Sequence, residues 1–306
     1  TKATECFGKM LTKEIRGLFI FGEDPVRTDP DTAHVMKALK NLDFLVMDEL
    51  FLTETAKMAD VVLPGRSYAE KEGTFSNTER RVQRIRKAVE IEGETKEDIW
   101  IFTEIMNRMG YPQHLTSAQV MDEVASVTPS FAGISHERLD SEEVAGNGLQ
   151  WPCTSKDHPG TPIMHVGKFS RGLGYCNPIE YIPSMELPDE EYPFKMMTGR
   201  VLYHYNACAM TDKTEGLNQI SGHSFIEINT EDAERIGFKD GDRVRVSSRR
   251  GSIETTANVS GKTNPGECWM PFHFLDGGAN WLTSDALDSI SSTPEYKVCA
   301  VKIERA

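Results

Sequence analysis

The chain has 306 residues, of which 39% are hydrophobic and 26% charged, a composition typical of a globular protein with room for two domains. Its net charge of −13 argues against a nucleic-acid binder, because phosphate contacts need a basic face. No apolar run approaches the roughly 20 residues that cross a bilayer, so direct membrane insertion is not expected. The six cysteines form no C-x-x-C pair, which indicates buried thiols in a reducing compartment rather than a zinc or iron–sulfur site.

The first hundred residues alternate between strand and helix signals. Apolar runs at 15–21, 42–47 and 60–63 each end at a turn and predict buried strands. Helical spacing of apolar residues after Asp31 and a short helical segment over 53–58 separate these runs. Strand, helix, strand, helix, strand in this order predicts right-handed crossovers and a parallel sheet.

A helix follows over 99–109, where the apolar residues recur on one face. The stretch 110–188 is rich in Pro, Gly and Ser, and we expect it to be irregular with one or two short helices. After Pro188 the pattern changes to short strands, with a capped helical turn over 230–237. Alternation and turn residues predict a small closed β structure with strands at 224–228, 243–248, 252–259 and 266–274.

Three groups of residues carry a resemblance to a known family. The first is FGEDP at 21–25, which follows a strand and is itself followed by ADVVLP at 59–64. The second is EGTFSNTERRVQ at 72–83. The third pairs TGR at 198–200 and His204-Tyr205 with TPEYK at 293–297. In this order and at this spacing they resemble the dimethyl sulfoxide reductase superfamily, and within it the catalytic subunit of formate dehydrogenases.

The resemblance implies an oxidoreductase that interconverts formate and CO₂ with two molybdopterin guanine dinucleotides around Mo or W. It implies a Rossmann-like α/β domain over 1–140, an irregular interdomain segment over 141–188, and a mostly-β double-psi barrel over 189–306 that binds the dinucleotide. Electrons would leave through iron–sulfur partner subunits.

The sequence also departs from the family pattern. The family's [4Fe–4S] domain, its metal-ligating selenocysteine or cysteine, and the His and Arg beside the substrate have no counterpart here, so we expect no catalytic residue in this chain. The expected partner is the N-terminal remainder of the catalytic subunit or the product of a split gene. We expect a cytoplasmic location, although a leader could lie upstream.

Carboxylates at strand ends are the first candidate cofactor contacts. Asp24, Thr28 and Asp48 follow or end predicted strands, where α/β sheets bind ligands. Asp98 resembles the family's guanine-reading carboxylate, because a carboxylate can accept both the N1–H and the amino group of guanine. The residues alone favour Asp24 and Asp98 as turn formers or helix caps, and the resemblance favours them as cofactor contacts.

A second set of candidates lies in the C-terminal half. Arg200 follows a glycine that lets the backbone approach a ligand, and its guanidinium could hold a phosphate with two bonds. Further cofactor contacts are expected from the residues that follow it and from the pair that matches the family's pterin contact: Val201, Leu202, His204, Tyr205, Asn206, Tyr296 and Lys297. The alternatives are a satisfied buried imidazole for His204 and an edge strand with an exposed lysine for the Tyr296–Lys297 pair.

Two questions stay open at this stage. The basic run Arg80, Arg81, Arg84, Arg86 and Lys87 could attract formate along an entry path or form a solvated strand face with salt bridges. The chain could also belong to another Mo/W oxidoreductase of the superfamily, or to a cofactor-free structural subunit of a redox complex. A dinucleotide-binding dehydrogenase is set aside, because the turn after the first strand is not G-x-G-x-x-G.

Overall fold

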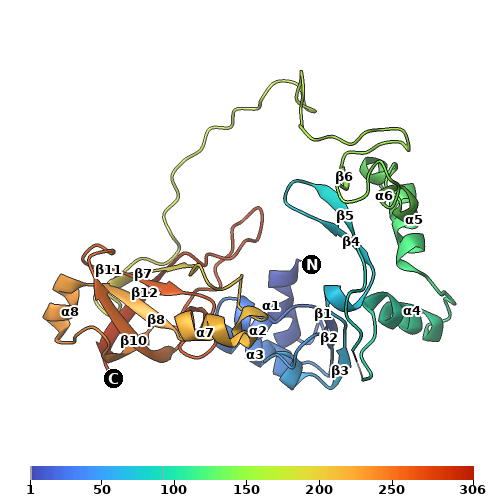
Figure 1. Cartoon of the computed structure of the whole chain (residues 1–306). Helices are drawn as coiled ribbons and strands as arrows, with labels where there is room; N and C mark the ends of the chain where they lie inside the picture. The colour runs from blue at the N-terminus through green and yellow to red at the C-terminus, as the bar shows by residue number, and fades with distance from the viewer. Residues whose placement is uncertain (1, 92) are drawn as a thin grey trace. The chain divides into compact units, whose positions relative to one another are not determined.

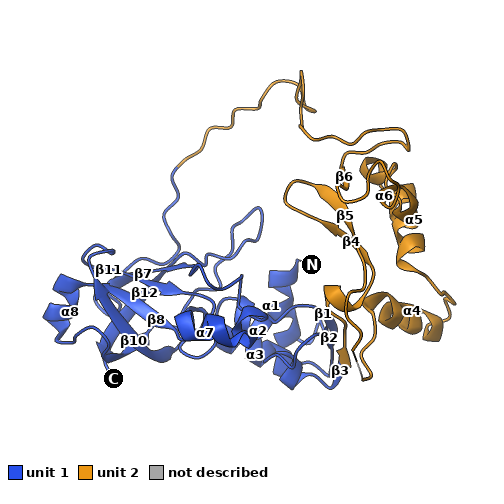
Figure 2. Cartoon of the chain, viewed as in Figure 1, with its two compact units in different colours: residues 1–62, 181–306 blue, residues 63–180 orange. Residues whose placement is uncertain are grey.

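The structure is a computed structural model that describes residues 2–91 and 93–306. The chain divides into two compact units, one formed by Thr1–Val62 with Tyr181–Ala306 and the other by Leu63–Glu180 (Figures 1 and 2). Within the described residues, none of the helices has the length and apolar character needed to cross a membrane.

The first part of unit 1 contains the predicted parallel sheet. β1 (Gly17–Phe21) pairs in parallel with β2 (Phe44–Glu49), and β3 (Val61–Pro64) completes the order β1-β2-β3. The buried side chains of the strands pack with those of the helices around a core that includes Met10, Val35, Leu39, Leu45 and Met47. The helices are η1 (Ala3–Glu5), α1 (Cys6–Leu11), α2 (Pro25–Thr28), α3 (Thr32–Lys40) and η2 (Ala56–Met58). The helical segment expected over 53–58 is shorter than predicted, with only its second half forming η2.

The second part of unit 1 is a closed barrel of six strands in the order β10-β8-β11-β7-β12-β9, which confirms the predicted closed β structure. β10 with β8 and β11 with β7 are parallel pairs, and the other neighbours are antiparallel. The strands are β7 (Phe194–Gly199), β8 (Phe225–Asn229), β9 (Arg243–Ser247), β10 (Ser252–Ser260), β11 (Glu267–Pro271) and β12 (Val298–Arg305).

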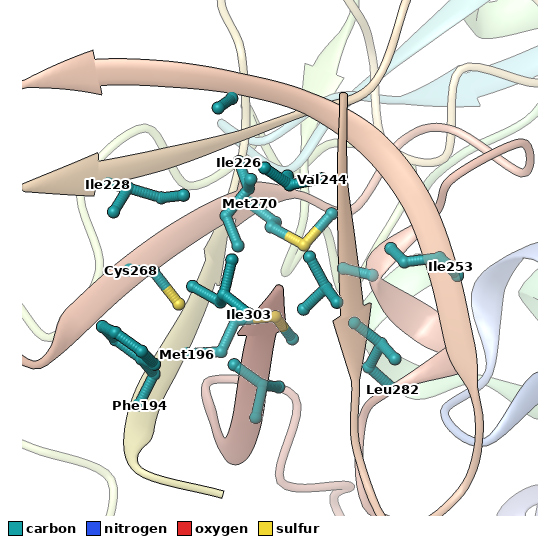
Figure 3. Close-up of a cluster of buried hydrophobic side chains, with 14 of the residues drawn as sticks. Phe194, Met196, Ile226, Ile228, Val244, Ile253, Cys268, Met270, Leu282 and Ile303 are labelled. Atoms are coloured by element: carbon teal, nitrogen blue, oxygen red, sulfur yellow. The ribbon is translucent and has the colours of Figure 1, made fainter. Parts of the chain in front are cut away.

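Alternating residues of the barrel strands point inward and form its core. Figure 3 shows Phe194, Met196, Ile226, Met270 and Ile303 converging in the interior, and all are buried. Each such side chain stabilises the fold by about 1.5–3 kcal/mol through burial. The barrel is therefore a packed support, and its contribution to a site comes from the loops at its strand ends.

Short helices connect the barrel strands. α8 (Thr230–Ile236) is capped at its start by Asn229, whose side chain accepts a hydrogen bond from the Glu231 amide. Gly237, with a left-handed φ of 92°, caps its end. This confirms the capped helical turn predicted over 230–237. The other helices of this part are η5 (Thr211–Lys213), α7 (Glu215–Ser221) and η6 (Ala279–Trp281).

Unit 2 is built around a hairpin of β4 (Gly73–Ser76) and β5 (Arg81–Ile85), to which the short β6 (Leu149–Gln150) is added. Its helices are η3 (Tyr68–Glu70), α4 (Asp98–Arg108), α5 (Ser117–Val127), η4 (Pro129–Phe131) and α6 (His136–Leu139). The expectation of only short helices after residue 110 is wrong for α5, which has 11 residues. Thr116 and Gln119 form a capping box at its start, a T-x-x-Q signal that the abundance of loop residues obscured.

Candidate cofactor site

The end of β7 and the loop before β12 bring together the two segments of the third family-like group, TGR at 198–200 and TPEYK at 293–297. β7 and β12 are antiparallel neighbours with Met197 opposite Val298, so Thr198 lies beside the Tyr296–Lys297 pair. The Thr198 hydroxyl donates to the Tyr296 carbonyl oxygen at 2.6 Å, and Lys297 Nζ donates to the Thr198 carbonyl oxygen at 3.3 Å. Residues almost a hundred positions apart therefore form one local site at the end of β7.

Gly199 lies directly against an indole ring. A Cβ atom at this position would be 2.5 Å from Trp269 Nε1 and 2.8 Å from Trp269 Cζ2, closer than real Cβ contacts. Gly199 pairs with Pro271 of the parallel neighbour β11, which fixes its backbone beside the Trp269 ring. The glycine thus allows the chain to pass the indole just before Arg200.

We expect Gly199→Ala to lower the free energy of unfolding by about 1–3 kcal/mol, because the added methyl group overpacks this contact. Gly261→Ala is the matched control, since no atom lies within 4 Å of a Cβ at that position. Urea unfolding of both variants measures the difference. Equal stability of the two variants would show that the Trp269 contact relaxes at no cost.

Arg200 offers an exposed guanidinium at the start of the loop. Its Cζ lies 5.0 Å from the centroid of the Phe272 ring, which supports the cation from one side. Its hydrogen bond to the Asn206 side-chain oxygen is long, at 3.5 Å. The geometry leaves N–H donors of Arg200 accessible for an anionic ligand, and the exposed Lys297 adds a second cation nearby.

The other predicted residues of this loop differ in their surroundings. His204 is buried, with Nε2–H donating to the Ser221 carbonyl oxygen and Nδ1 bonded to the Thr211 hydroxyl at 3.0 Å. Its ring therefore matches the alternative of a satisfied buried imidazole. Leu202 and Tyr205 are exposed at 90% and 78%. Val201 and Leu202 line a pocket of about 460 Å³ on the barrel, together with Met197, Phe225, Glu227, Lys262, Thr263 and Trp269.

Asp24 lies in the turn after β1 and Asp48 lies near the carboxyl end of β2, the positions predicted for them. Both are buried. Asp24 Oδ1 accepts hydrogen bonds from the amide and hydroxyl of Thr55, at 3.0 and 2.6 Å. Asp24 Oδ2 is buried and, within the described residues, accepts no hydrogen bond. Asp24 precedes α2, but its side chain does not cap that helix. Thr28 donates its hydroxyl to the Asp29 carboxylate and the Asp24 carbonyl.

This turn is strongly acidic, and burial changes the proton affinity of its groups. Burial raises the pKa of Asp29, and the nearby Glu23 carboxylate adds to the rise. Burial likewise raises the pKa of Glu49, with Asp24 and Glu23 contributing. Burial raises the pKa of Tyr296, and the negative charges of Asp29 and Glu23 raise it further. The turn thus favours a ligand that donates hydrogen bonds.

Arg27 and Asn280 are site residues that sequence reasoning missed. Arg27 Nη1 donates to Asp212 Oδ2 at 2.7 Å, and Arg27 Nε lies 3.8 Å from Asp24 Oδ2. The hydrogen bond to Asp212 raises the pKa of Arg27 against the opposing effect of burial. Asn280 Nδ2 donates to the carbonyl oxygens of Arg27 and Thr28 at 2.9 and 3.3 Å. These contacts join the acidic turn to the barrel loops within unit 1. No local sequence pattern predicts them, because the residues lie far apart in the chain.

Asp98 belongs to unit 2 and stands at the first turn of α4. Its carboxylate forms an ion pair with Lys71, and both side chains are largely buried. Both residues line a pocket of about 300 Å³ that also includes Phe75, Ile85 and Met121. The structure therefore places Asp98 in a partly enclosed pocket of unit 2, where the Lys71 ammonium balances its charge.

The basic side chains of the run at 80–87 form ion pairs and hydrogen bonds within unit 2. Arg84 and Arg86 both pair with Asp140, and Arg81 pairs with Glu79. Arg80 donates to the carbonyl oxygens of residues 151, 161 and 162, and its guanidinium lies 5.6 Å from the Trp151 ring centroid. Lys87 pairs with Glu90. These contacts favour the salt-bridged strand face over a formate entry path.

Comparison with known proteins identifies the class of this site. Residues 1–108 match the molybdopterin oxidoreductase family, and residues 194–300 match the molydopterin dinucleotide binding domain. The chain therefore carries two domains of the molybdopterin oxidoreductase kind, as its motifs indicated.

Two of the similar proteins are named formate dehydrogenases. The chain is 48% identical over 298 residues to F420-dependent formate dehydrogenase 2 subunit alpha of Methanococcus maripaludis, covering 96% of this chain and 43% of that protein. It is 37% identical over 297 residues to formate dehydrogenase H of Escherichia coli, covering 95% and 41%. The solved structure of acetylene hydratase from Pelobacter acetylenicus shares the fold, with a TM-score of 0.72 at 18% identity over 98% of this chain and 46% of that chain. The chain thus spans less than half the length of these relatives.

The residues present suit a molybdopterin dinucleotide. Exposed Arg200 and Lys297 match phosphate and pterin acceptors, and Gly199 brings the backbone past the Trp269 indole beside them. The buried Asp24 carboxylate keeps an oxygen without a hydrogen bond, which is the acceptor that a guanine or pterin N–H would use. Unit 1 thus offers exposed cations at the end of β7 and a buried carboxylate oxygen in the turn after β1.

Proposed function

We propose that this chain is the cofactor-holding C-terminal part of a Mo- or W-dependent formate dehydrogenase that interconverts formate and CO₂. The observation that carries the proposal is the meeting of Thr198–Arg200 with Tyr296–Lys297 at the end of β7, beside the acidic turn after β1. The printed names of its relatives at 48% and 37% identity support formate as the substrate.

The residues divide the work of binding two molybdopterin guanine dinucleotides. Arg200 and Lys297 hold anionic oxygens, with Val201, Leu202, Tyr205 and Asn206 as neighbouring contacts. Asp24, Thr28, Asp48 and Tyr296 offer polar groups to the pterin or guanine on the sheet side. His204 contributes by holding its loop, because both of its nitrogens already have partners. When bound, the cofactor supplies the two-electron redox chemistry, and the chain orients it and excludes water.

The domain description follows from the same proposal. The parallel β1–β2 pair supports a Rossmann-like domain within 1–140, and the two parallel pairs of the barrel support a double-psi topology within 189–306, with 141–188 between them. The residues that react with formate and a [4Fe–4S] cluster belong, in this proposal, to the part of the enzyme outside this chain. Iron–sulfur subunits would take the electrons, in the cytoplasm.

The proposal is tested by formate-dependent dye reduction in the native complex that contains this chain, compared with the isolated chain. We expect turnover with formate in the complex and none from the chain alone. Nitrate reduction without formate oxidation in the complex would support another member of the superfamily instead. Coenzyme F420 is included as an acceptor because the relative at 48% identity is F420-dependent by name.

Asp98 provides a separate test of guanine recognition. We expect Asp98→Asn to reduce discrimination between guanine and cytosine dinucleotides by about tenfold, because an amide cannot accept both guanine N–H groups as a carboxylate does. Asp140→Asn is the matched control, since it also removes ion pairs within unit 2. Unchanged discrimination in Asp98→Asn would leave Asp98 with only its structural ion pair to Lys71.

A further inference from the structure

His273 occupies a central position beneath the loop at residues 200–206, which we call the arginine loop. It follows β11, the parallel neighbour of β7, so the segments that leave the two strands run side by side. The side chain is fully buried, with 0% of its surface exposed. Its ring lies 4.7 Å from the centroid of Phe272, the ring that supports Arg200.

Both ring nitrogens of His273 bond to the backbone of the arginine loop. Nε2 accepts a hydrogen bond from the Val201 amide at 2.8 Å, and Nδ1 donates to the Asn206 carbonyl oxygen. An amide can only donate and a carbonyl can only accept, so these partners fix one neutral tautomer with the proton on Nδ1. A single imidazole therefore spans the two ends of the loop.

The loop needs such a support because its far end is strained. Asn206 and Cys208 adopt left-handed φ angles of 46° and 52°, which non-glycine residues keep only when their surroundings hold them. The Cys208 thiol donates to the His273 carbonyl oxygen at 3.1 Å, and the Phe272 amide donates to the Gly199 carbonyl at 3.2 Å. The segment at 272–273 thus contacts the chain just before the arginine loop, at the end of the loop and at Cys208, two residues after it.

We propose that His273 is a positioning residue whose neutral imidazole clamps the arginine loop in the conformation that presents Arg200 to the cofactor, and that protonation of the imidazole releases the loop. The purpose of the clamp rests on the proposed function. The clamp itself is a property of this chain and is measurable with no cofactor bound.

The charged surroundings set the direction of the pH response. Burial lowers the pKa of His273, the Asn206 carbonyl opposes this, and the neighbouring His204 and Arg200 lower it further. Beyond them, Cys208 contacts Arg27 Nη1 at 3.6 Å, and that guanidinium is paired with Asp212. A histidine whose folded pKa is depressed contributes stability above its unfolded pKa of about 6.5. That stability falls as the pH drops from about 6.5 through the folded pKa, so the loop is clamped at neutral pH and released in acid.

The first test needs no variant. Nitrogen-15 NMR of the histidine rings of the full chain should show His273 as the Nδ1–H tautomer at neutral pH. On acidification, the His273 ring should take up its second proton at a lower pH than a free imidazole does, because burial lowers its pKa. An Nε2–H tautomer, or protonation of the ring at or above the pH at which a free imidazole is protonated, would overturn the clamp.

Two variants separate the two hydrogen bonds. His273→Asn keeps a donor near the Nδ1 position and loses the acceptor for Val201, whereas His273→Gln keeps an acceptor near the Nε2 position. Hydrogen–deuterium exchange of the Val201 amide should be about tenfold faster in His273→Asn and close to wild type in His273→Gln. His223→Gln, at an exposed histidine of the same unit, is the control and should change nothing.

GMP released by acid from the native complex gives the second readout. Both His273 variants should hold less GMP than wild type, with His273→Asn losing more. Unchanged exchange at Val201 in both variants overturns the clamp and leaves the proposed function intact. Faster exchange with full GMP content overturns the positioning role. A wild-type complex without GMP contradicts the proposed function, while the exchange result still decides the clamp.

Discussion

Replacing Arg27 by alanine should lower the free energy of unfolding by about 3–5 kcal/mol, the cost of breaking a buried ion pair on one side. Arg27 has 13% of its side chain exposed and faces Asp212 at 2.7 Å and Asp24 at 3.8 Å. Without the guanidinium, the Asp24 carboxylate in particular, with 4% of its side chain exposed, would remain buried without a counterion. Urea unfolding of the full chain measures the loss.

Two further variants show whether this loss comes from the ion pair. Arg245→Ala removes a pair with Glu254 whose side chains are 51% and 47% exposed, and it should cost no more than about 1 kcal/mol. Arg27→Met combined with Asp212→Leu should recover only part of the stability, because it removes the Asp212 carboxylate and leaves that of Asp24 without a counterion. A loss for Arg27→Ala as small as that for Arg245→Ala would contradict the bridging role of Arg27.

Replacing Arg200 by alanine should weaken dinucleotide binding by about 10- to 100-fold, the usual value of a charged hydrogen bond to an anion. Because Arg200 is exposed and makes one long hydrogen bond, the same change should leave the free energy of unfolding within about 0.5 kcal/mol of wild type. This contrast of a large binding loss with a small stability loss distinguishes a ligand contact from a structural residue.

The measurement is GMP content of the native complex after acid release, made on wild type and variant at equal chain concentration. Arg200→Lys should fall between them, since an ammonium keeps the charge but loses the two-pronged geometry of the guanidinium. Full GMP content in Arg200→Ala would remove Arg200 from the site.

Sequence periodicity and turn chemistry predicted the elements that local signals control. Alternation or capping residues predicted four barrel strands (β8, β9, β10 and β11), the parallel β1–β2 pair and α8 with its Asn229 and Gly237 caps. The strands β7 and β12 were not predicted in this way. The end of β7 could also be proposed as a candidate site from the sequence, because Gly199 and Arg200 stand next to each other in the chain.

The parts that could not be predicted depend on residues far apart in the sequence. Arg27 meets Asp212 across 185 positions, and His273 meets Val201 across 72. No periodicity marks either contact, since each arises only after the sheet turn and the barrel loops have packed. For His204, the local sequence suggested a cofactor contact. The structure instead buries its ring and gives both ring nitrogens hydrogen-bond partners within the chain.

The most direct test of the central claim is the metal and GMP content of the native complex that contains this chain. A bis-dinucleotide enzyme predicts about two GMP per Mo or W ion, in line with a cofactor that carries the chemistry while the protein binds and orients it. An intact complex with neither metal nor GMP would contradict the account and would mean that the fold serves as a scaffold.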